Sequence, residues 1–169
     1  MAGSADTAIG VLGVDLDAND VSALQDQGIR VNTLHGVAVY AKAVANTPMG
    51  SLCVVAPSSA AASASAIATL VSTGNVNSAP GYLAINQADV SADQYGWFYT
   101  EGRQSSRVRV LIAAQPFVPL YTTGTGGVVD DAVVSTGRIE GLQILASAAS
   151  ASAPQAVFAN LTRITQDIA

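Results

Sequence analysis

Residues 95–122 read YGWFYTEGRQSSRVRVLIAAQPFVPLYT, and this stretch decides the fold. Its aromatic segment 95–99 and its Arg/Val segment 107–110 both alternate with a period of two residues. A period of two is typical of β-strands, because successive side chains point to opposite faces of a sheet. Glu101-Gly102 supplies turn chemistry between the two segments. Strands are therefore predicted over residues 96–100, 108–114 and 118–122.

The same pattern continues on both sides of this stretch. Alternating or short apolar runs predict six further strands, over residues 29–33, 37–40, 52–55, 82–86, 138–146 and 155–164. The strands of the C-terminal half recur roughly every ten residues with Gly-bearing turns between them, which is typical of antiparallel sandwiches and barrels. The sequence predicts a mainly β fold, an antiparallel β-sandwich or barrel-like domain with one or two short helices.

Two segments carry the helix predictions. Asn19 or Asp20 is a suitable N-cap for a short helix that Gly28 would end. Residues 58–70, SSAAASASAIATL, are rich in helix-permissive Ala and predict a second helix, with small-residue strands as the alternative. We expect residues 1–28 to form an N-terminal arm with its short helix, and residues 29–169 to form a single β-rich domain.

Composition excludes several classes of function. The chain has 169 residues, a net charge of −5 and 7 Lys+Arg, so it lacks the basic stripe that nucleic-acid binding requires. No run of about 20 apolar residues predicts a membrane span. Charged residues make up 11% of the chain, against roughly 25% in ordinary soluble domains. Either the exterior is bland and neutral, or partner subunits cover much of it, and we favour covered surface.

The chemistry-bearing residues form no catalytic constellation. His35 and Cys53 are the single histidine and cysteine, and the apolar run around Cys53 indicates a buried, inert thiol. Acidic residues over 15–26 approach a calcium-loop spacing but lack its central Gly and its final Glu. The Gly-rich segment 123–127 lacks the Lys-Ser/Thr ending of a phosphate loop and is typical of a turn. We therefore predict a non-enzyme without catalytic, cofactor-binding or metal-binding residues.

Two groups of side chains are candidates for an interface with a partner or between subunits. Tyr95, Trp97 and Tyr99 share one face of a predicted strand, as a core stripe or as an exposed platform for a partner or ligand. Arg103, Arg107 and Arg109 form the basic cluster of the chain, either as a solvated or salt-bridged face or as a contact to a partner's carboxylates.

The chain from about residue 79 to its C-terminus resembles the capsid decoration, or cement, proteins of tailed bacteriophages. The resemblance rests on an ordered series of short motifs. These are the QYGW strand at Asp93–Tyr99, Glu101-Gly102, the Arg/Val strand Arg107–Ile112, the Pro-Leu-Tyr-Thr-Thr segment Pro119–Thr123, the Gly-rich turn and Gly137–Gly141. An Ala-rich tail follows, as in that family. The N-terminal half has no such match.

The resemblance implies a β-rich structural protein located on the outer capsid surface of the virion. Such a protein commonly forms a homotrimer at local three-fold positions of the expanded capsid and clamps neighbouring capsomers against internal pressure. Its partners would be the major capsid protein and further copies of itself. The alternative is a head-fibre or tail-associated module that binds host glycans through the aromatic stripe.

Overall fold

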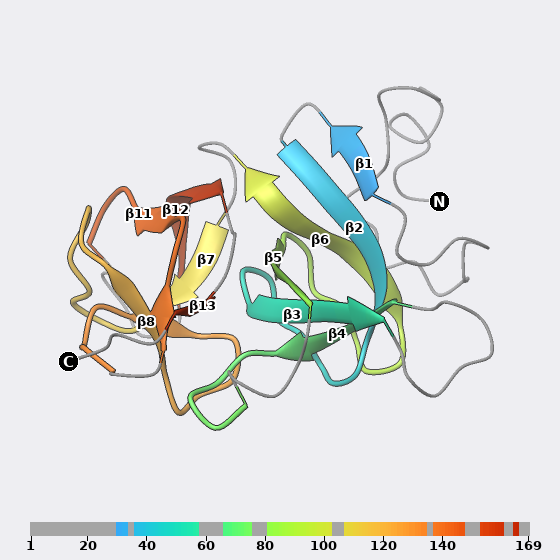
Figure 1. Ribbon diagram of the computed structural model, residues 1–169, viewed down its shortest axis with the longest axis horizontal. Coiled ribbons are helices and arrows are strands. Elements are labelled where there is room, and N and C mark those ends of the chain that lie inside the picture. Colours follow the sequence, from blue (N-terminus) through green and yellow to red (C-terminus); the bar gives the residue numbers. More distant parts are fainter. Residues whose placement is uncertain are drawn as a thin grey trace.

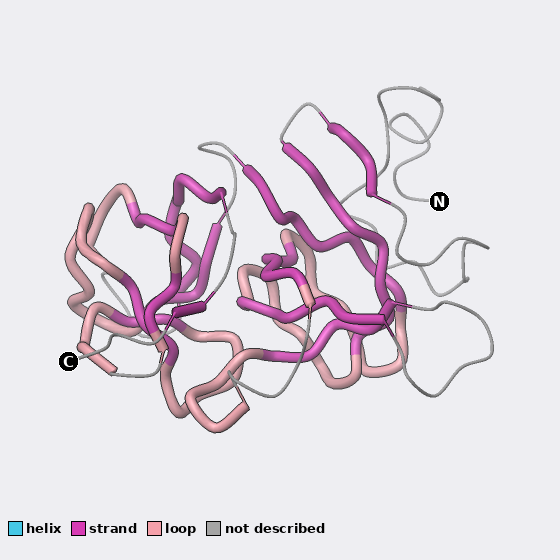
Figure 2. Tube along the Cα trace, in the orientation of Figure 1, coloured by secondary structure: helices cyan, strands magenta, loops and turns pink. Residues whose placement is uncertain are grey.

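The computed structural model describes residues 30–33, 36–57, 66–75, 81–102, 107–134, 137–147, 153–160 and 164–165 (Figure 1). This part of the chain contains thirteen strands and no helix (Figure 2). The strands are β1 (Arg30–Thr33), β2 (Gly36–Ala43), β3 (Leu52–Pro57), β4 (Ala66–Leu70), β5 (Tyr82–Asn86), β6 (Tyr95–Gly102), β7 (Arg107–Val110), β8 (Leu120–Thr122), β9 (Val129–Asp130), β10 (Arg138–Ile139), β11 (Leu142–Ile144), β12 (Ala153–Asn160) and β13 (Ile164–Thr165).

Five of the strands close into a barrel-like sheet. They pair in the order β2-β4-β3-β5-β6, and β6 pairs with β2 to complete the circle. β2 and β4 run parallel, whereas the other pairs of the barrel are antiparallel. β1 pairs with the first half of β2, Gly36–Val39, and so adds a further strand to the sheet. In Figure 1 this barrel occupies the blue-to-green half of the ribbon.

Small side chains fill the barrel. Along β2, β3, β4 and β5 the inward positions hold mostly Ala, Val and Cys53, and Phe98 of β6 is the largest residue of this group. A barrel with few strands has a narrow interior, so only small residues fit from most of its strands. Ala therefore forms half of this buried cluster, because at these positions the narrow barrel leaves room for little more than a methyl group.

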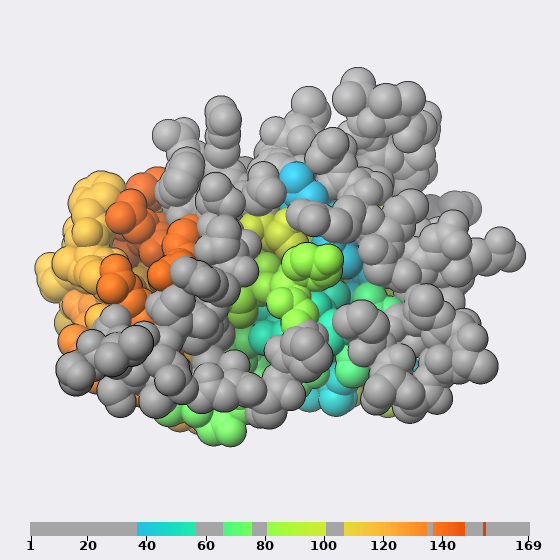
Figure 3. Space-filling model, in the orientation of Figure 1, coloured from blue at the N-terminus to red at the C-terminus, as the bar shows by residue number. Residues whose placement is uncertain are grey.

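The second sheet pairs in the order β12-β7-β9-β8-β10-β13. β12 connects it to the barrel, because its first half pairs with β7 and its end pairs with β6. β11 lies on the other side of β12. β7 and β9 are parallel, and the remaining pairs of this sheet are antiparallel. Its residues, yellow to orange in Figure 3, form one end of the molecule.

The main hydrophobic core lies between the two sheets. Leu52 and Ile85 point outward from the barrel and pack with Val108, Leu120 and Ile144 of the second sheet and the neighbouring β11, all at most 1% exposed. Burial of side chains of this size contributes about 1.5–3 kcal/mol each. The barrel and the second sheet therefore share one core.

Gly127 fastens the second sheet to the barrel through its backbone. Its carbonyl accepts a hydrogen bond from the Leu52 N–H at 2.9 Å, and its own N–H donates to the Val71 carbonyl at 2.7 Å. Its φ of 76° lies in the left-handed region, and an added Cβ would meet Leu70 and Ser51 side-chain atoms at 2.8 Å. Glycine fits this position on both counts.

The structure confirms the predicted mainly β, barrel-like class. The strand predicted over 82–86 coincides with β5, and the one over 96–100 lies within β6. The strand predicted over 138–146 is instead two strands, β10 and β11, because Gly141, at φ 82°, turns the chain from one pairing partner to another. The predicted strand 108–114 ends early, at Val110, because Ala113 adopts a left-handed φ of 70°.

The helix prediction over 58–70 is wrong for residues 66–70, which form β4. This strand pairs with β3 over five positions, and Ala66, Ala68 and Leu70 face the barrel while Ile67 and Thr69 face outward. Ala favours helix in isolation, but tertiary packing overrides that weak preference. Residues 58–65, the helix predicted over 19–28 and the N-terminal arm 1–28 lie outside the described residues.

Candidate interaction surfaces

The aromatic stripe of β6 lies on the outer side of the barrel. Tyr40 of β2 joins it, with its ring centroid 5.8 Å from that of Tyr95 in a stacked arrangement and 5.0 Å from that of Trp97 in a tilted one. Trp97 is 5% exposed and Tyr99 4%, whereas Tyr95 is half-buried. Aromatic pairs at these separations stabilise packing beyond their buried area.

This burial corresponds to the core alternative for the stripe. A platform for a sugar ring or a partner anchor needs an open ring face, and the rings of Trp97 and Tyr99 are enclosed within the subunit. The sequence showed that the three residues share a face, but the packing of Tyr40 against them depends on the β2–β6 pairing, which places Tyr40 opposite Trp97.

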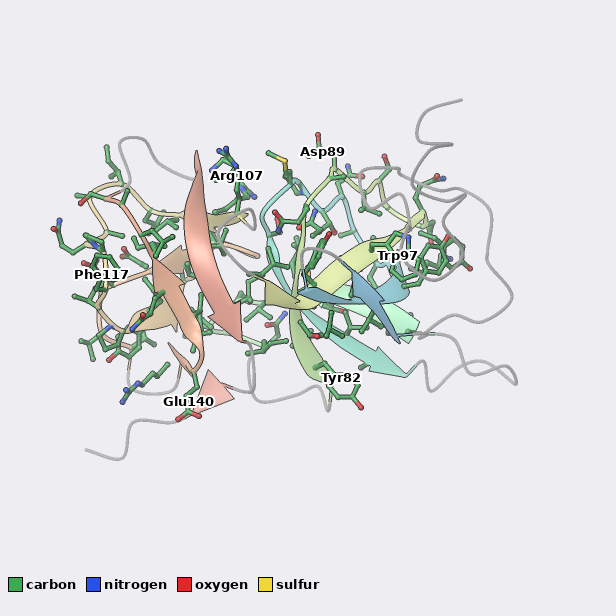
Figure 4. All side chains as sticks on the ribbon, turned by 90° about the horizontal axis from the view of Figure 1, so that it is seen from above. Tyr82, Asp89, Trp97, Arg107, Phe117 and Glu140 are labelled. Carbon is green, nitrogen blue, oxygen red and sulfur yellow. The ribbon has the colours of Figure 1, made fainter. Side chains whose placement is uncertain are left out.

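The structure describes two of the three residues of the predicted basic cluster. Arg103 lies outside the described residues, whereas Arg107 and Arg109 alternate with buried Val108 and Val110 on the outward face of β7. Arg107 is exposed and Arg109 is half-buried, with its side-chain Cγ close to Gly50. Figure 4 shows the Arg107 side chain at the upper edge of the molecule.

Gln87 fixes the backbone at the start of β7. Its Oε1 accepts a hydrogen bond from the Arg107 N–H at 2.8 Å, and its Nε2 donates to the Arg107 carbonyl at 3.2 Å. A side-chain amide that pairs with both backbone groups of one residue holds that residue as a neighbouring strand would. The exposed Arg107 guanidinium therefore extends from a fixed backbone.

A second surface, which the sequence patterns missed, lies at the far end of β7 and β9. We call it the apolar tip, and it consists of Ile112, Phe117 and Val133, which are 61%, 65% and 74% exposed. The Leu111 N–H donates to the Val129 carbonyl, and the Asp131 carboxylate accepts a hydrogen bond from the Gln115 N–H at 3.0 Å. These bonds hold the two loops of the tip together.

The backbone of the apolar tip is strained. Ala113 and Phe117 have φ values of 70° and 61°, in the left-handed region that is uncommon for non-glycine residues. Such strain persists only where the surrounding structure holds it, and it is concentrated at functional sites. The signal in the sequence is Pro116 and Pro119, which bracket Phe117 and keep it out of a regular strand.

A groove of about 610 Å³ borders the apolar tip. Phe117, Val118 and Pro119 line one side of it, and the corner between β10 and β11, residues 138–143, lines the other. Arg138 and Glu140 both lie along this corner. Phe117, at the left end of the molecule in Figure 4, therefore lies between open solvent and a concave surface of its own subunit.

Burial and local hydrogen bonds shift the pKa values of three ionisable groups among the described residues. Burial raises the pKa of the Cys53 thiol far above its usual range, so this sulfur stays protonated and unreactive. Desolvation raises the pKa of Asp130, with a contribution from the charge of neighbouring Asp131. The carboxylate of Asp93 accepts a hydrogen bond from Lys42 Nζ at 2.8 Å, and this bond raises the pKa of Lys42.

Two of the candidates weighed for chemistry cannot be located in the structure. His35 and the acidic segment 15–26 lie outside the described residues. Among the residues that the structure does describe, no three His, Cys, Asp or Glu side chains gather where they could hold a metal ion. The same residues include no helix with the length and apolar character needed to cross a membrane.

Comparison with known proteins adds no relative. No family model matches the chain, and no curated protein or solved structure matches it either.

Proposed function

We propose that this chain is a structural virion protein of a tailed bacteriophage. It binds the outer surface of the expanded capsid, as a homotrimer at local three-fold positions, and stabilises the shell against internal pressure. Its partners are the major capsid protein and further copies of itself. It carries out no catalysis and uses no cofactor.

The observation that carries the proposal is the apolar tip. Three large apolar side chains at one end of the second sheet are each more than half exposed. Large apolar side chains exposed on the loops at one end of a sheet are typical of a surface that another protein covers. The left-handed backbone of Phe117 indicates that the surrounding structure maintains its exposure. The resemblance to decoration proteins suggests two such proteins, a further copy of this chain and the major capsid protein.

Two further features support a structural role. The motifs behind the resemblance occupy positions that build the fold: the YGWFY segment forms β6, which pairs with β2, β5 and β12. The 11% charge content suits an exterior that partners cover. A trimer multiplies each contact, so modest affinity at each subunit becomes strong avidity.

Capsid stability tests the stabilising role directly. Expanded capsids of the phage that encodes this chain, prepared with and without it, are heated and diluted into low salt, and released shell protein is measured. We expect the complete capsids to withstand higher temperature and lower salt. Equal resistance of the two preparations would contradict the proposal.

No observation favours the alternative of a host-glycan module. That hypothesis placed the sugar on the face of Tyr95, Trp97 and Tyr99, and two of these three rings are buried in the subunit. Binding of the purified chain to a glycan array, abolished by Trp97→Ala in a folded variant, would revive it.

A further inference from the structure

Arg107 places an exposed positive charge at the start of β7, at one end of the β7–β9 pair. Its two backbone hydrogen bonds with the Gln87 side chain fix its backbone, while the Arg107 side chain is exposed. Within the described residues its guanidinium forms no ion pair. A charged group whose backbone is already ordered loses less conformational entropy when it binds a partner.

An acidic and apolar surface lies at the opposite end of the same pair. The Asp131 carboxylate accepts the hydrogen bond of the Gln115 N–H there, on the two loops that carry Ile112, Phe117 and Val133. Asp130, the last residue of β9, adds a second carboxyl group. This end therefore combines negative charge with exposed apolar area.

The two ends are too far apart to pair within one subunit. Val110 of β7 is opposite Val129 of β9, and the strands are parallel. Arg107 precedes this position by three residues and Asp131 follows it by two, which places them about 16 Å apart along the strands at roughly 3.3 Å per residue. A direct ion pair requires about 4 Å or less. Figure 4 likewise shows Arg107 well separated from Phe117.

We propose that copies of this chain associate head to tail, with Arg107 of one copy against Asp131 and the apolar tip of the next. The inference rests on the proposed homotrimer and assigns the surfaces that form it. Contacts between two different surfaces are heterologous, and three such contacts close into a ring when the rotation allows it.

Charge complementarity identifies a second copy as the occupant. Each copy carries a net charge of −5, and an exposed cation at the contact between two copies lowers their mutual repulsion. Arg107 supplies that cation, and the neighbouring copy supplies the carboxylates next to an apolar surface. Opposite charges across an interface set its register and suppress wrong pairings, while burial of Phe117 and its neighbours drives association.

Charge reversal of the full-length chain tests this contact. Sedimentation velocity and native mass spectrometry give the oligomeric state of Arg107→Asp and Asp131→Arg, each alone and combined. We expect each single variant to weaken association by about tenfold or more, and the double variant, which restores opposite charges, to recover assembly. Assembly that is insensitive to both single changes, or that the double variant fails to recover, overturns the proposal.

Matched variants separate assembly from folding. Arg107→Gln and Ser91→Asp lower the net charge equally, but Ser91 is an exposed residue before β6 on the barrel, so only Arg107→Gln should weaken the trimer. Asp131→Asn keeps an oxygen that caps Gln115 and removes the charge. Phe117→Gly relieves the left-handed φ, so it should weaken assembly without lowering the thermal unfolding temperature.

Binding of the same variants to capsids distinguishes this inference from the proposed function. If Arg107→Asp remains trimeric and binds capsids as the wild type does, the head-to-tail contact is wrong and the capsid role stands. If the wild type forms the charge-dependent trimer but binds no capsid, the contact stands and the capsid role is wrong. A chain that stays monomeric, or forms an open series of ever larger species, contradicts the closed ring.

Discussion

Asn86 joins two loops at one end of the barrel. Its Nδ2 has the carbonyl oxygens of Thr47, Pro48 and Ala88 at 2.7–2.9 Å, and its Oδ1 accepts from the Ser51 N–H at 2.8 Å. The residue is 0% exposed, so these backbone groups have little access to water. An amide supplies both donors and an acceptor here, which no apolar side chain can replace.

Asn86→Ala should lower the free energy of unfolding by about 3–5 kcal/mol, because it leaves several buried backbone groups unpaired. Urea denaturation of the variant, with Ser91→Ala as an exposed control, measures the change. A loss of less than about 1 kcal/mol would mean that water replaces the amide, contrary to this account.

Trp97→Ala should lower the free energy of unfolding by about 3–5 kcal/mol, because the indole is buried against Tyr40. Tyr82→Ala is the control: its ring is 54% exposed on β5, and we expect a loss below about 1 kcal/mol. The denaturant midpoints of the two variants measure both changes in stability. Similar losses of unfolding free energy in Trp97→Ala and Tyr82→Ala would contradict burial of the stripe.

Asp130→Asn should stabilise the subunit at neutral pH. Desolvation raises the pKa of Asp130 in the folded state, so the folded protein binds a proton more readily than the unfolded chain. Stability from this group is therefore present below its ordinary carboxyl pKa and is lost as the pH rises through the raised folded pKa. The advantage of the variant should shrink on acidification, as thermal unfolding across pH 3–7 would reveal; a constant or growing advantage would contradict the sign.

At the scale of the elements, β4 shows what local pattern can and cannot predict. Strands with clear alternation, such as β6 and β7, could be placed from the sequence because their period of two is a local property. The Ala/Ser tract has no such signal. Its last residues become a strand because the narrow barrel accepts Ala66 and Ala68, and that requirement comes from distant strands.

Ala68→Leu should destabilise the barrel by about 1–3 kcal/mol or more, because the side chain is 1% exposed and faces a filled interior. Ala92→Leu, the same change at an exposed turn, serves as the control and should change stability little. Comparison of their thermal unfolding measures the difference. Equal stability of the two variants would show that the barrel has spare volume.

The candidate surfaces show the same division between local and long-range information. The shared face of Arg107 and Arg109 follows from spacing alone. The exposure of Phe117 does not, because it depends on a left-handed φ and on the Asp131 cap from another loop. The burial of Trp97 likewise depends on Tyr40, which the β2–β6 pairing brings from more than fifty residues away.

At the scale of the whole molecule, three features suit a protein that works in assemblies. They are the low charge content, the apolar tip and the exposed Arg107 on β7, for which the described residues provide no ion-pair partner. Each copy presents complementary surfaces at two ends of one sheet, and a ring would leave its other faces for the capsid. The low charge content of the sequence suggested that partners cover part of the exterior. Which part of the exterior this is could be proposed only from the folded structure.

Co-sedimentation of the purified chain with capsids of its own phage tests the central claim most directly. Expanded and unexpanded capsids are saturated with the chain, and the bound copies per capsid are counted. We expect saturable binding to expanded capsids alone, at three copies per local three-fold position. Absence of binding to either form, or equal binding to both, would contradict it.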